Sequence, residues 1–250
     1  MREFFRACLI GDVEKVASLL DTVNINSRDI DNKTTGLMQA AWNGKTQVVK
    51  LLLQHGASID LQDVDGETAL MAAIDHSRTI PKNIVRALID GGANLNIQNK
   101  SGWTALMMAA QMKKLVDIVE ILLKSGAKTD IKNNCGDTAL DKAIENQNIR
   151  AVFLFNPDMI NEQDDEGRTW LMQACSSKDE DEILFLYEKG ADFFIFDFDE
   201  DESKRQSAYD ILVAHETLST KLQALKEILM LDNFVDRVRS FKLFLQQTQM

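Results

Sequence analysis

The sequence has few residues that interrupt helices, with only 2 Pro and 12 Gly among its 250 residues. Proline removes a backbone donor and breaks helices, so its scarcity beside 10 Met favours a helical protein over an all-β one. The chain also has no Pro-rich or Gly/Ser-rich stretch that would serve as a linker. We therefore expect one continuous, mainly helical body.

Long apolar runs are absent as well. The first residues, Met1 to Arg6, carry charges where a signal peptide needs an apolar run. No later window approaches the roughly eighteen apolar residues that a membrane-spanning helix requires. We expect a cytoplasmic protein without membrane insertion.

The sequence also lacks the usual signatures of enzymes and cofactor sites. It has no phosphate-binding glycine loop, no H-E-x-x-H and no G-x-S-x-G. Its 3 histidines, His55, His76 and His215, lie far apart and offer no paired general base and nucleophile. We expect no catalysis and no cofactor; the alternative is an unrecognised site in residues 155–250, for example one using His215 and Cys175.

Cysteines are few and acidic loops lack the calcium pattern. Cys8, Cys135 and Cys175 are odd in number, far apart and without a C-x-x-C motif, which predicts reduced thiols in or near the core. The carboxylates that begin at Asp197 lack the Gly that a calcium loop needs at its sixth place, and Ala208 stands at its twelfth. We expect no metal site.

The formal charge of -11 is concentrated in one segment. Residues 158–202 contain 16 Asp and Glu but only 3 Lys and Arg, a net charge of -13, whereas the rest of the chain has a net charge of +2. Such a segment repels a nucleic-acid backbone, so nucleic acid is not expected as a partner. The segment is either a solvated face or a surface that attracts a basic partner.

A repeated string dominates the sequence. Five copies of a Thr-x-Leu motif occur, each with Ala three residues after the Leu, and the leucines are spaced 33, 36, 34 and 31 residues apart: Leu37, Leu70, Leu106, Leu140 and Leu171. A second series of Gly-Ala pairs closes most of the units after an apolar run, at Gly56, Gly92, Gly126 and Gly190. A period of this length is typical of a solenoid.

These residues resemble the ankyrin repeat, whose pattern runs D-x-x-G-x-T-P-L-H-x-A and then a second helix that ends in L-L-x-x-G-A. The resemblance implies an all-α solenoid of stacked antiparallel helix pairs joined by β-hairpin-like loops, without a cofactor. The expected parts are an N-terminal capping repeat (1–29), an array (30–215) with units from about residues 30, 63, 99, 133 and 164 and a degraded unit near 200, and a C-terminal helical cap (216–250).

The helices of one unit can also be predicted from local sequence signals alone, independently of the family resemblance. Thr68 suits a helix N-cap, and Leu70, Ala73 and Ile74 fall on one face of the helix that follows. A second apolar stripe follows and ends at Gly92, which can adopt the positive φ that terminates a helix. Each helix pair is too thin to bury its own stripe, so neighbouring pairs are expected to stack.

Some positions depart from the motif. Its usual His is replaced by Met at four positions, so packing must replace the hydrogen bonds of that His: Met38, Met71, Met107 and Met172. The closing L-L-x-x-G-A is missing after residue 155, where Asn156 and Pro157 stand instead. We expect the stack to bend or loosen there.

The resemblance also indicates a binding surface, because hairpin tips and inner helices line the concave groove of such stacks. Carried over by position, the candidate partner-binding residues are Trp42, Asp65, Glu67, Asp75, His76, Lys100, Trp103, Gln111, Met112, Asp137 and Glu145. Trp42 and Trp103 are candidate aromatic anchors, although either could instead pack on a neighbouring unit. The nearby carboxylates favour a partner protein with a basic or mixed-charge surface.

The tail carries two apolar helical stripes, one from Leu218 to Leu229 and one formed by Val235, Val238, Phe241 and Leu245. We expect it to cover the open end of the solenoid in a monomer; a dimer seam or a partner-binding helix is the alternative.

The functional prediction is a non-enzymatic scaffold that binds another protein. The resemblance to bacterial versions of the repeat suggests an effector delivered into a host cell. An intracellular regulator or inhibitor of an enzyme in its own cell is the alternative.

Overall fold

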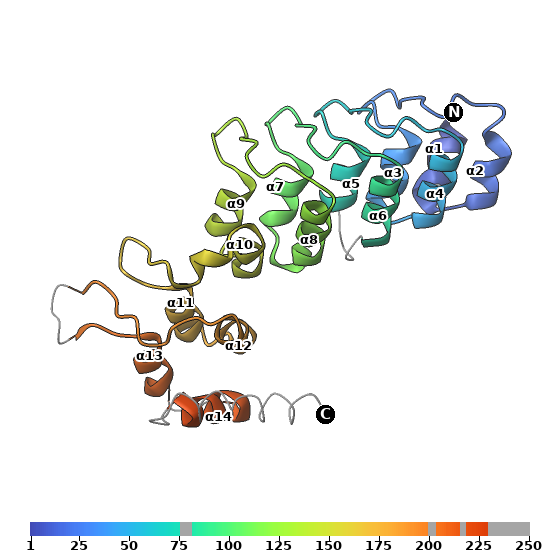
Figure 1. The fold of residues 1–250 in the computed structure, drawn as a ribbon. Coiled ribbons are helices and arrows are strands. Elements are labelled where there is room, and N and C mark those ends of the chain that lie inside the picture. The colour runs from blue at the N-terminus through green and yellow to red at the C-terminus, as the bar shows by residue number, and fades with distance from the viewer. Residues whose placement is uncertain (76–81, 200–203, 216–218, 230–250) are drawn as a thin grey trace. The chain divides into compact units, whose positions relative to one another are not determined.

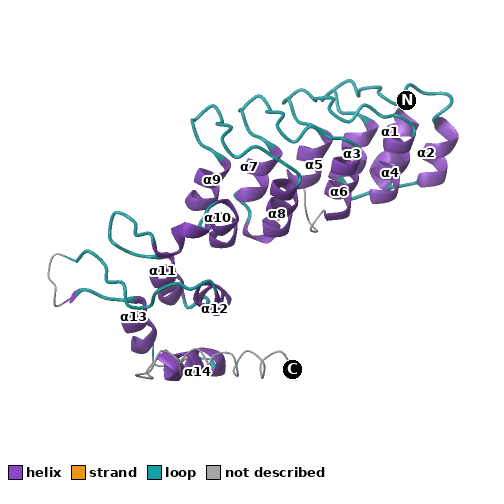
Figure 2. Ribbon diagram, in the orientation of Figure 1, coloured by secondary structure: helices purple, strands orange, loops and turns teal. Residues whose placement is uncertain are grey.

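The structure is a computed structural model, and it describes residues 1–75, 82–199, 204–215 and 219–229. These residues form helices joined by loops, and the described part contains isolated antiparallel bridges instead of strands (Figure 2). The all-α class is confirmed. The chain divides into two compact units, Met1–Asn156 and Pro157–Met250, which differs from the single body expected. The division lies where the closing L-L-x-x-G-A is missing.

The first unit is a row of helix pairs (Figure 1). Its inner helices are α1 (Arg2–Ile10), α3 (Gly36–Trp42), α5 (Ala69–Asp75), α7 (Ala105–Ala110) and α9 (Ala139–Glu145). Its outer helices are α2 (Val13–Leu19), α4 (Thr46–Gln54), α6 (Lys82–Asp90), α8 (Val116–Lys124) and α10 (Ile149–Phe155), and a short 3-10 turn η1 (Lys113–Leu115) precedes α8. Each inner helix contacts the next inner helix, and each outer helix contacts the next outer helix. This is the stacking that was predicted.

Hairpin-like loops, here called fingers, connect successive pairs and leave the first unit on the same side (Figure 2). The fingers of this unit are residues 28–35, 62–68, 98–104 and 132–138. Each ends in a Thr whose hydroxyl accepts the N–H of the residue three positions later, which confirms the predicted N-caps: Thr35, Thr68, Thr104 and Thr138. Each finger therefore fixes where the inner helix that follows it begins.

The core is formed by the apolar stripes of the motif. Leu37, Leu70 and Leu106 are at most 2% exposed, and their partners on the outer helices, such as Val49 and Leu88, are fully buried. The four Met residues that replace the motif's His are also at most 3% exposed. Packing does take the place of the missing His at these positions.

Neighbouring repeats are also joined by side chains that bind backbone. The Gln62 amide donates to the carbonyl of Gln98 at 3.1 Å, and the Gln98 amide donates to that of Lys132 at 2.9 Å. The Asp60 carboxylate accepts the N–H of Asn94 at 3.0 Å, and the Asn96 side chain accepts the N–H of Lys128 at 2.9 Å. We call these bonds the ladder; each of them links a repeat to the next one.

The fingers themselves stack closely. The N–H of Asn134 donates to the carbonyl of Ser101 at 3.1 Å. Gly102 has φ +78°, and a Cβ at this position would lie 2.7 Å from the Asn134 nitrogen. Only glycine combines this conformation with so close a neighbour.

The second unit contains η2 (Pro157–Asn161), α11 (Trp170–Ser177), α12 (Glu180–Glu188), α13 (Ala208–Ala214) and α14 (Thr220–Leu229). Its described fingers are residues 163–169 and the two segments 196–199 and 204–207. The degraded repeat does begin a helix, because Ser207 caps α13 by accepting the N–H of Asp210 at 3.2 Å. Leu222, Leu225 and Leu229 of α14 are buried, and α14 contacts α13. Leu218 and the second predicted stripe of the tail lie outside the described residues.

One prediction about the cysteines is wrong. Cys8 and Cys175 are buried as expected, but Cys135 is exposed. Its finger tip is held by Asn133, whose side chain accepts the N–H of Cys135 at 2.9 Å, and this geometry leaves the Cys135 side chain in solvent.

Candidate functional site

The finger of residues 62–68 positions two of the candidate carboxylates. The Asp63 carboxylate accepts the N–H groups of Asp65 and Glu67, both at 2.9 Å, and the N–H of Asp63 donates to the Glu67 carbonyl at 3.0 Å. Asp side chains often accept hydrogen bonds from nearby backbone N–H groups, and such bonds stabilise a turn of this kind. Asp63 thereby fixes the backbone at Asp65 and Glu67.

A groove of about 760 Å³ lies beside this finger in the first unit. Five of the predicted partner-binding residues line it: Trp42, Asp65, Glu67, Asp75 and Lys100. They come from helix α3, helix α5 and two successive fingers. The structure thus brings together residues that the sequence places up to 58 positions apart.

The groove is strongly acidic. Two further carboxylates, Asp29 and Asp63, line it, so five carboxylates face one Lys. Burial raises the pKa of Glu67, and the charges of Asp75 and Asp63 raise it further. Within the described part of the chain, no Lys, Arg or His forms an ion pair with Asp65, Glu67 or Asp75. The groove therefore attracts positive charge that the described residues around Asp65, Glu67 and Asp75 do not supply.

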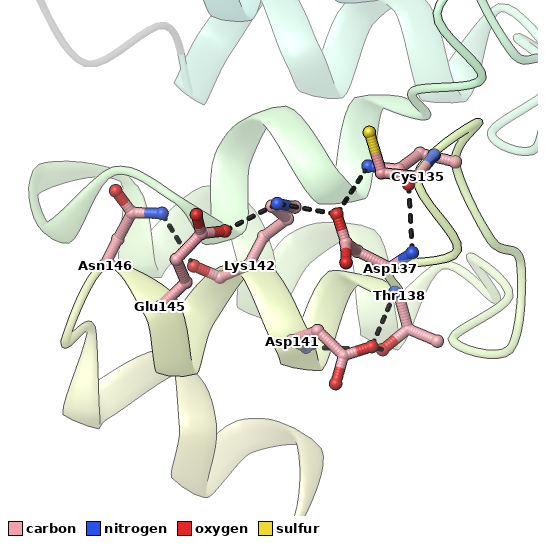
Figure 3. Close-up of polar contacts among 8 residues, drawn as sticks. Cys135, Asp137, Thr138, Asp141, Lys142, Glu145 and Asn146 are labelled. Carbon is pink, nitrogen blue, oxygen red and sulfur yellow. Dashed lines mark hydrogen bonds and ion pairs between the residues drawn. The ribbon is translucent and has the colours of Figure 1, made fainter.

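Three other predicted residues form a second cluster around a lysine, and Figure 3 shows two of them, Asp137 and Glu145, beside Lys142. The Lys142 ammonium lies 2.7 Å from Asp137 Oδ2 and 2.5 Å from Glu145 Oε2, and it lies 5.6 Å from the centre of the Trp103 ring. The Lys142 side chain is only 12% exposed. Lys142 and then Asn133 hold the pKa of Asp137 below its usual value, while Asp137 and Glu145 raise the pKa of Lys142. Here the chain neutralises its own carboxylates.

The two clusters occupy the same positions of the repeat. Glu67 and Asp75 lie one residue before and seven residues after the capping Thr68, and Asp137 and Glu145 lie at the same distances from Thr138. The residue four positions after the cap is Ala72 in one case and Lys142 in the other. Ala72 lines the groove and is 7% exposed. The groove is thus the same arrangement without its cation.

The remaining predicted residues are placed as follows. Gln111 and Met112 are half-buried at the end of α7 and are not among the groove-lining residues. His76 lies outside the described residues. Trp42 is 37% exposed, whereas Trp103 is less exposed and lies against Lys142.

Sequence reasoning missed Lys142 and Ala72, which decide the charge of the two clusters. The signal was available, because aligning the repeats on their capping Thr places Lys142 between two carboxylates and Ala72 between two others. Asp29 and Asp63 were not among the predicted residues, but their carboxylates bind the finger turns and line the groove.

The candidate dyad of the second unit does not have the geometry of a nucleophile and a base. His215 Nε2 lies 2.8 Å from the carbonyl oxygen of Cys175, so the ring contacts the Cys175 backbone. Burial raises the pKa of the Cys175 thiol to about 12, the opposite of what a nucleophilic thiolate needs. Nor does any group of three His, Cys, Asp or Glu within the described ranges have the arrangement to hold a metal ion.

No helix in the described ranges is both long enough and apolar enough to cross a membrane.

Comparison with known proteins gives matches along most of the chain. A family model described as "Ankyrin repeats (3 copies)" matches residues 4–99, 37–133, 76–158 and 115–197. The chain is 42% identical over 73 residues to the E3 ubiquitin-protein ligase hecd-1 of Caenorhabditis elegans, and 35% identical over 79 residues to the E3 ubiquitin-protein ligase KEG of Arabidopsis thaliana. These matches cover 28% and 31% of this chain, but only 3% and 5% of the two relatives.

Proposed function

Because the chain belongs to the ankyrin repeat family, whose repeats generally act as non-enzymatic interaction modules, we propose that it is a non-catalytic scaffold that binds a partner protein. The binding surface in this proposal is the acidic groove of the first unit, and the bound element is a basic segment of the partner. The scaffold acts as a monomer and without a cofactor.

One observation carries this proposal. Glu67 and Asp75 stand where Asp137 and Glu145 stand in a later repeat, but Ala72 replaces the lysine that neutralises the later pair. A Lys or Arg side chain of the partner would supply the missing charge between Glu67 and Asp75. Burial raises the pKa of Glu67 most, and binding would relieve the repulsion by Asp75 and Asp63 that raises this pKa further.

The groove also offers an aromatic anchor. Trp42 ends helix α3, lines the groove and keeps 37% of its surface exposed. A tryptophan beside carboxylates can cover the apolar stem of a Lys or Arg side chain, and its ring attracts the charge. Aromatic residues of this kind contribute much of the binding energy of protein interfaces.

The proposal can be tested with carboxyl-to-amine crosslinking in a lysate of the source organism. A carbodiimide should join Glu67 or Asp75 to a partner lysine, and mass spectrometry of the crosslinked peptide then identifies both the partner and its basic segment. The Glu67→Gln/Asp75→Asn variant should lose this crosslink and the captured protein.

A matched control has the same change at exposed carboxylates away from the groove, Asp90→Asn/Asp130→Asn. It should capture the partner as wild type does. Equal capture by wild type and by the groove variant, once circular dichroism shows that both are folded, would rule out the groove as the binding surface.

The cellular setting is a separate part of the proposal. An effector delivered into a host cell and a regulator of an enzyme in its own cell would use the same groove. Detection of the native protein outside the producing cells supports the effector hypothesis, whereas retention of all of it with an enzyme as the crosslinked partner supports the regulator hypothesis. The ligase activity of the two relatives is not proposed for this chain, because the matched segments are a few per cent of those proteins.

A further inference from the structure

The acidic groove and the second cluster are built on the same hydrogen-bonded backbone. In the finger beside the groove, the Asp63 side chain accepts the N–H groups two and four positions later, both at 2.9 Å. In the finger of the second cluster, the Asn133 side chain accepts the corresponding N–H groups, also at 2.9 Å. The helices that follow these fingers, α5 and α9, both have seven residues. The carboxylates of the two sites therefore start from equivalent points of the backbone.

The lengths of these carboxylate side chains compensate each other. In the groove the finger carries Glu67 and the helix carries Asp75. In the second cluster the finger carries Asp137 and the helix carries Glu145. Each pair contains one Asp and one Glu, so the combined reach of the two side chains is the same. In the groove, the point where both carboxylates can meet one cation is therefore shifted toward the helix but preserved.

An asparagine side chain holds the finger carboxylate in both sites. Glu67 accepts a hydrogen bond from the Asn99 side chain, and Asp137 accepts one from Asn133 at 3.1 Å. A carboxylate has lone pairs for several donors, and Asp137 still binds Lys142 at 2.7 Å. The bond from Asn99 therefore leaves Glu67 able to accept a cation as well.

Each site also has a tryptophan from the preceding repeat. Trp103 comes directly before the capping Thr104, and its ring centre lies 5.6 Å from the Lys142 ammonium. Trp42 comes seven residues after the capping Thr35 and lines the groove. The groove thus combines a pair of carboxylates with an aromatic ring, as the second cluster does, but it has Ala72 at the position of the lysine.

The groove has room for a lysine side chain that enters from solvent. Its volume of about 760 Å³ is in the range of sites that take small ligands. Ala72 ends at its Cβ, and Asp75 is exposed, so the groove opens to solvent beside the carboxylates. Lys100 also lines the groove, but in the part of the chain that the structure describes it forms no ion pair with Glu67 or Asp75.

The geometry of the second cluster suits a primary ammonium. Lys142 Nζ lies within hydrogen-bond distance of one oxygen from the finger and of one oxygen from the helix (Figure 3). An ammonium is a compact charge with three rotatable donors, so a single nitrogen can bond to both carboxylates. A guanidinium is a planar fork that pairs best with the two oxygens of one carboxylate. It would leave the other carboxylate of the pair without this direct contact.

On the basis of the proposed function of the groove, we propose that the groove selects an unmodified lysine of the partner over an arginine, and that acetylation of this lysine abolishes binding. In the complex, the ammonium lies between Glu67 and Asp75, and the apolar stem of the lysine lies on Trp42. Acetylation removes the charge and leaves a single N–H donor, so the two carboxylates are no longer neutralised. The modification state of one partner lysine then controls assembly.

The test uses the full chain and fluorescent octapeptide mixtures with blocked ends, and binding is followed by fluorescence anisotropy. A central position is fixed as Lys, Arg, acetyl-lysine or norleucine, and the other positions are mixtures of uncharged residues. The fixed residue therefore carries the only charge, and norleucine keeps the apolar stem without the ammonium. We expect wild type to bind the Lys mixture about tenfold more tightly than the Arg mixture, and the acetyl-lysine mixture no better than the norleucine mixture.

Two variants locate this preference in the groove. Glu67→Gln/Asp75→Asn should bind the four mixtures alike, because both carboxylates are removed. Ala72→Lys supplies an ammonium from the chain itself and should also lose the preference for the Lys mixture. The control Asp90→Asn/Asp130→Asn changes exposed carboxylates outside the groove and should keep the wild-type preference. Circular dichroism shows which variants are folded, and the carboxylate variant suffices if Ala72→Lys is not.

The outcomes distinguish this inference from the function on which it rests. Equal binding of the Lys and Arg mixtures, with both weakened in Glu67→Gln/Asp75→Asn, overturns the lysine selectivity and leaves the groove as a site for basic segments. Equal binding of the Lys and acetyl-lysine mixtures, or of the Lys and norleucine mixtures, overturns the role of the ammonium. Equal binding of the Lys mixture by wild type and by the carboxylate variant overturns the inference, and the crosslinking experiment then decides separately whether the groove binds a partner.

Discussion

Two pairs of carboxylates on the inner side of the first unit occupy the same positions in the repeat. A lysine of the chain neutralises one pair, whereas the other pair has an alanine at the position of that lysine. Asp137 and Glu145 hold Lys142 between them, and the pKa of Asp137 is lowered. Glu67 and Asp75 have Ala72 at the position of that lysine, and the pKa of Glu67 is raised by burial and then by the charges of Asp75 and Asp63. The repeat fixes where the carboxylates lie, and one further side chain decides whether the site is complete or needs a cation from outside.

The largest expected effect comes from supplying that cation. Ala72→Lys should place an ammonium between Glu67 and Asp75, lower the pKa of Glu67, and weaken binding of the crosslinked partner by about a hundredfold, as loss of a desolvated charge pair typically does. Calorimetric titration measures the affinity. Ala72→Met fills similar space without a charge and should weaken partner binding far less. If the lysine and methionine variants bind alike, bulk rather than charge governs the groove.

Removing the cation from the second cluster should have the next largest effect. Lys142→Met leaves Asp137 and Glu145 without a counter-charge, so the melting temperature should fall by several degrees at neutral pH. The lowered pKa of Asp137 contributes stability above the usual Asp value of 3.8, and this contribution is lost as the pH falls through the lower pKa of the folded state. The difference in melting temperature between wild type and Lys142→Met should therefore become smaller near about pH 3.

The control for this comparison is Lys128→Met, which changes an exposed lysine of the same unit. Its melting temperature should stay close to that of wild type at both pH values. A gap for Lys142→Met that is independent of pH would mean that Lys142 stabilises the fold by packing and not through Asp137.

Substitution of the two tryptophans should have different effects: one should lower stability and the other should weaken partner binding. Trp103→Ala removes the ring beside Lys142 and should cost about 1–2 kcal/mol of unfolding free energy, while partner binding is retained. Trp42→Ala should weaken partner binding by about tenfold, because this ring lines the groove. Urea unfolding and calorimetric titration of both variants separate the two roles, and a binding loss confined to Trp103→Ala would reverse the assignment.

The smallest expected effect is a gain in stability. The raised pKa of Glu67 means that the folded protein loses stability as the pH rises from the usual Glu value of 4.5 through the raised value. Glu67→Gln removes this charge and should stabilise the fold at neutral pH by less than about 1 kcal/mol, because solvent screens the half-exposed side chain. Thermal melts at neutral pH and near about pH 4 should show the gain shrinking at the lower pH. A loss of stability at neutral pH would contradict the account of the groove as a site of repulsion.

The parts of the fold that depend on local signals could be predicted from the sequence. Thr68 and Thr138 cap helices, Gly92 adopts φ +87° after α6, and Leu70 is buried, as the motif indicates. The ladder could not be predicted in this way, because the partner of Gln98 is a backbone carbonyl of another repeat. Those bonds depend on the register between repeats and not on any local pattern.

The candidate site was predictable to a similar extent. Motif positions placed Glu67, Asp75 and Trp42 on the concave side, and the groove does contain them. The sequence did not distinguish them from Asp137, because the difference lies in whether a lysine reaches the carboxylates. The division of the chain after Asn156 and the exposure of Cys135 also differ from what composition suggested.

The ladder has an evolutionary consequence. The Gln62 and Gln98 amides bind main-chain carbonyls, and every residue type provides such a carbonyl. A repeat that is duplicated, deleted or exchanged therefore meets the same acceptors in its new neighbour, whatever that neighbour's sequence. The surface residues of each repeat can then change without altering the junctions, so a lineage can acquire new partners by reshuffling whole repeats.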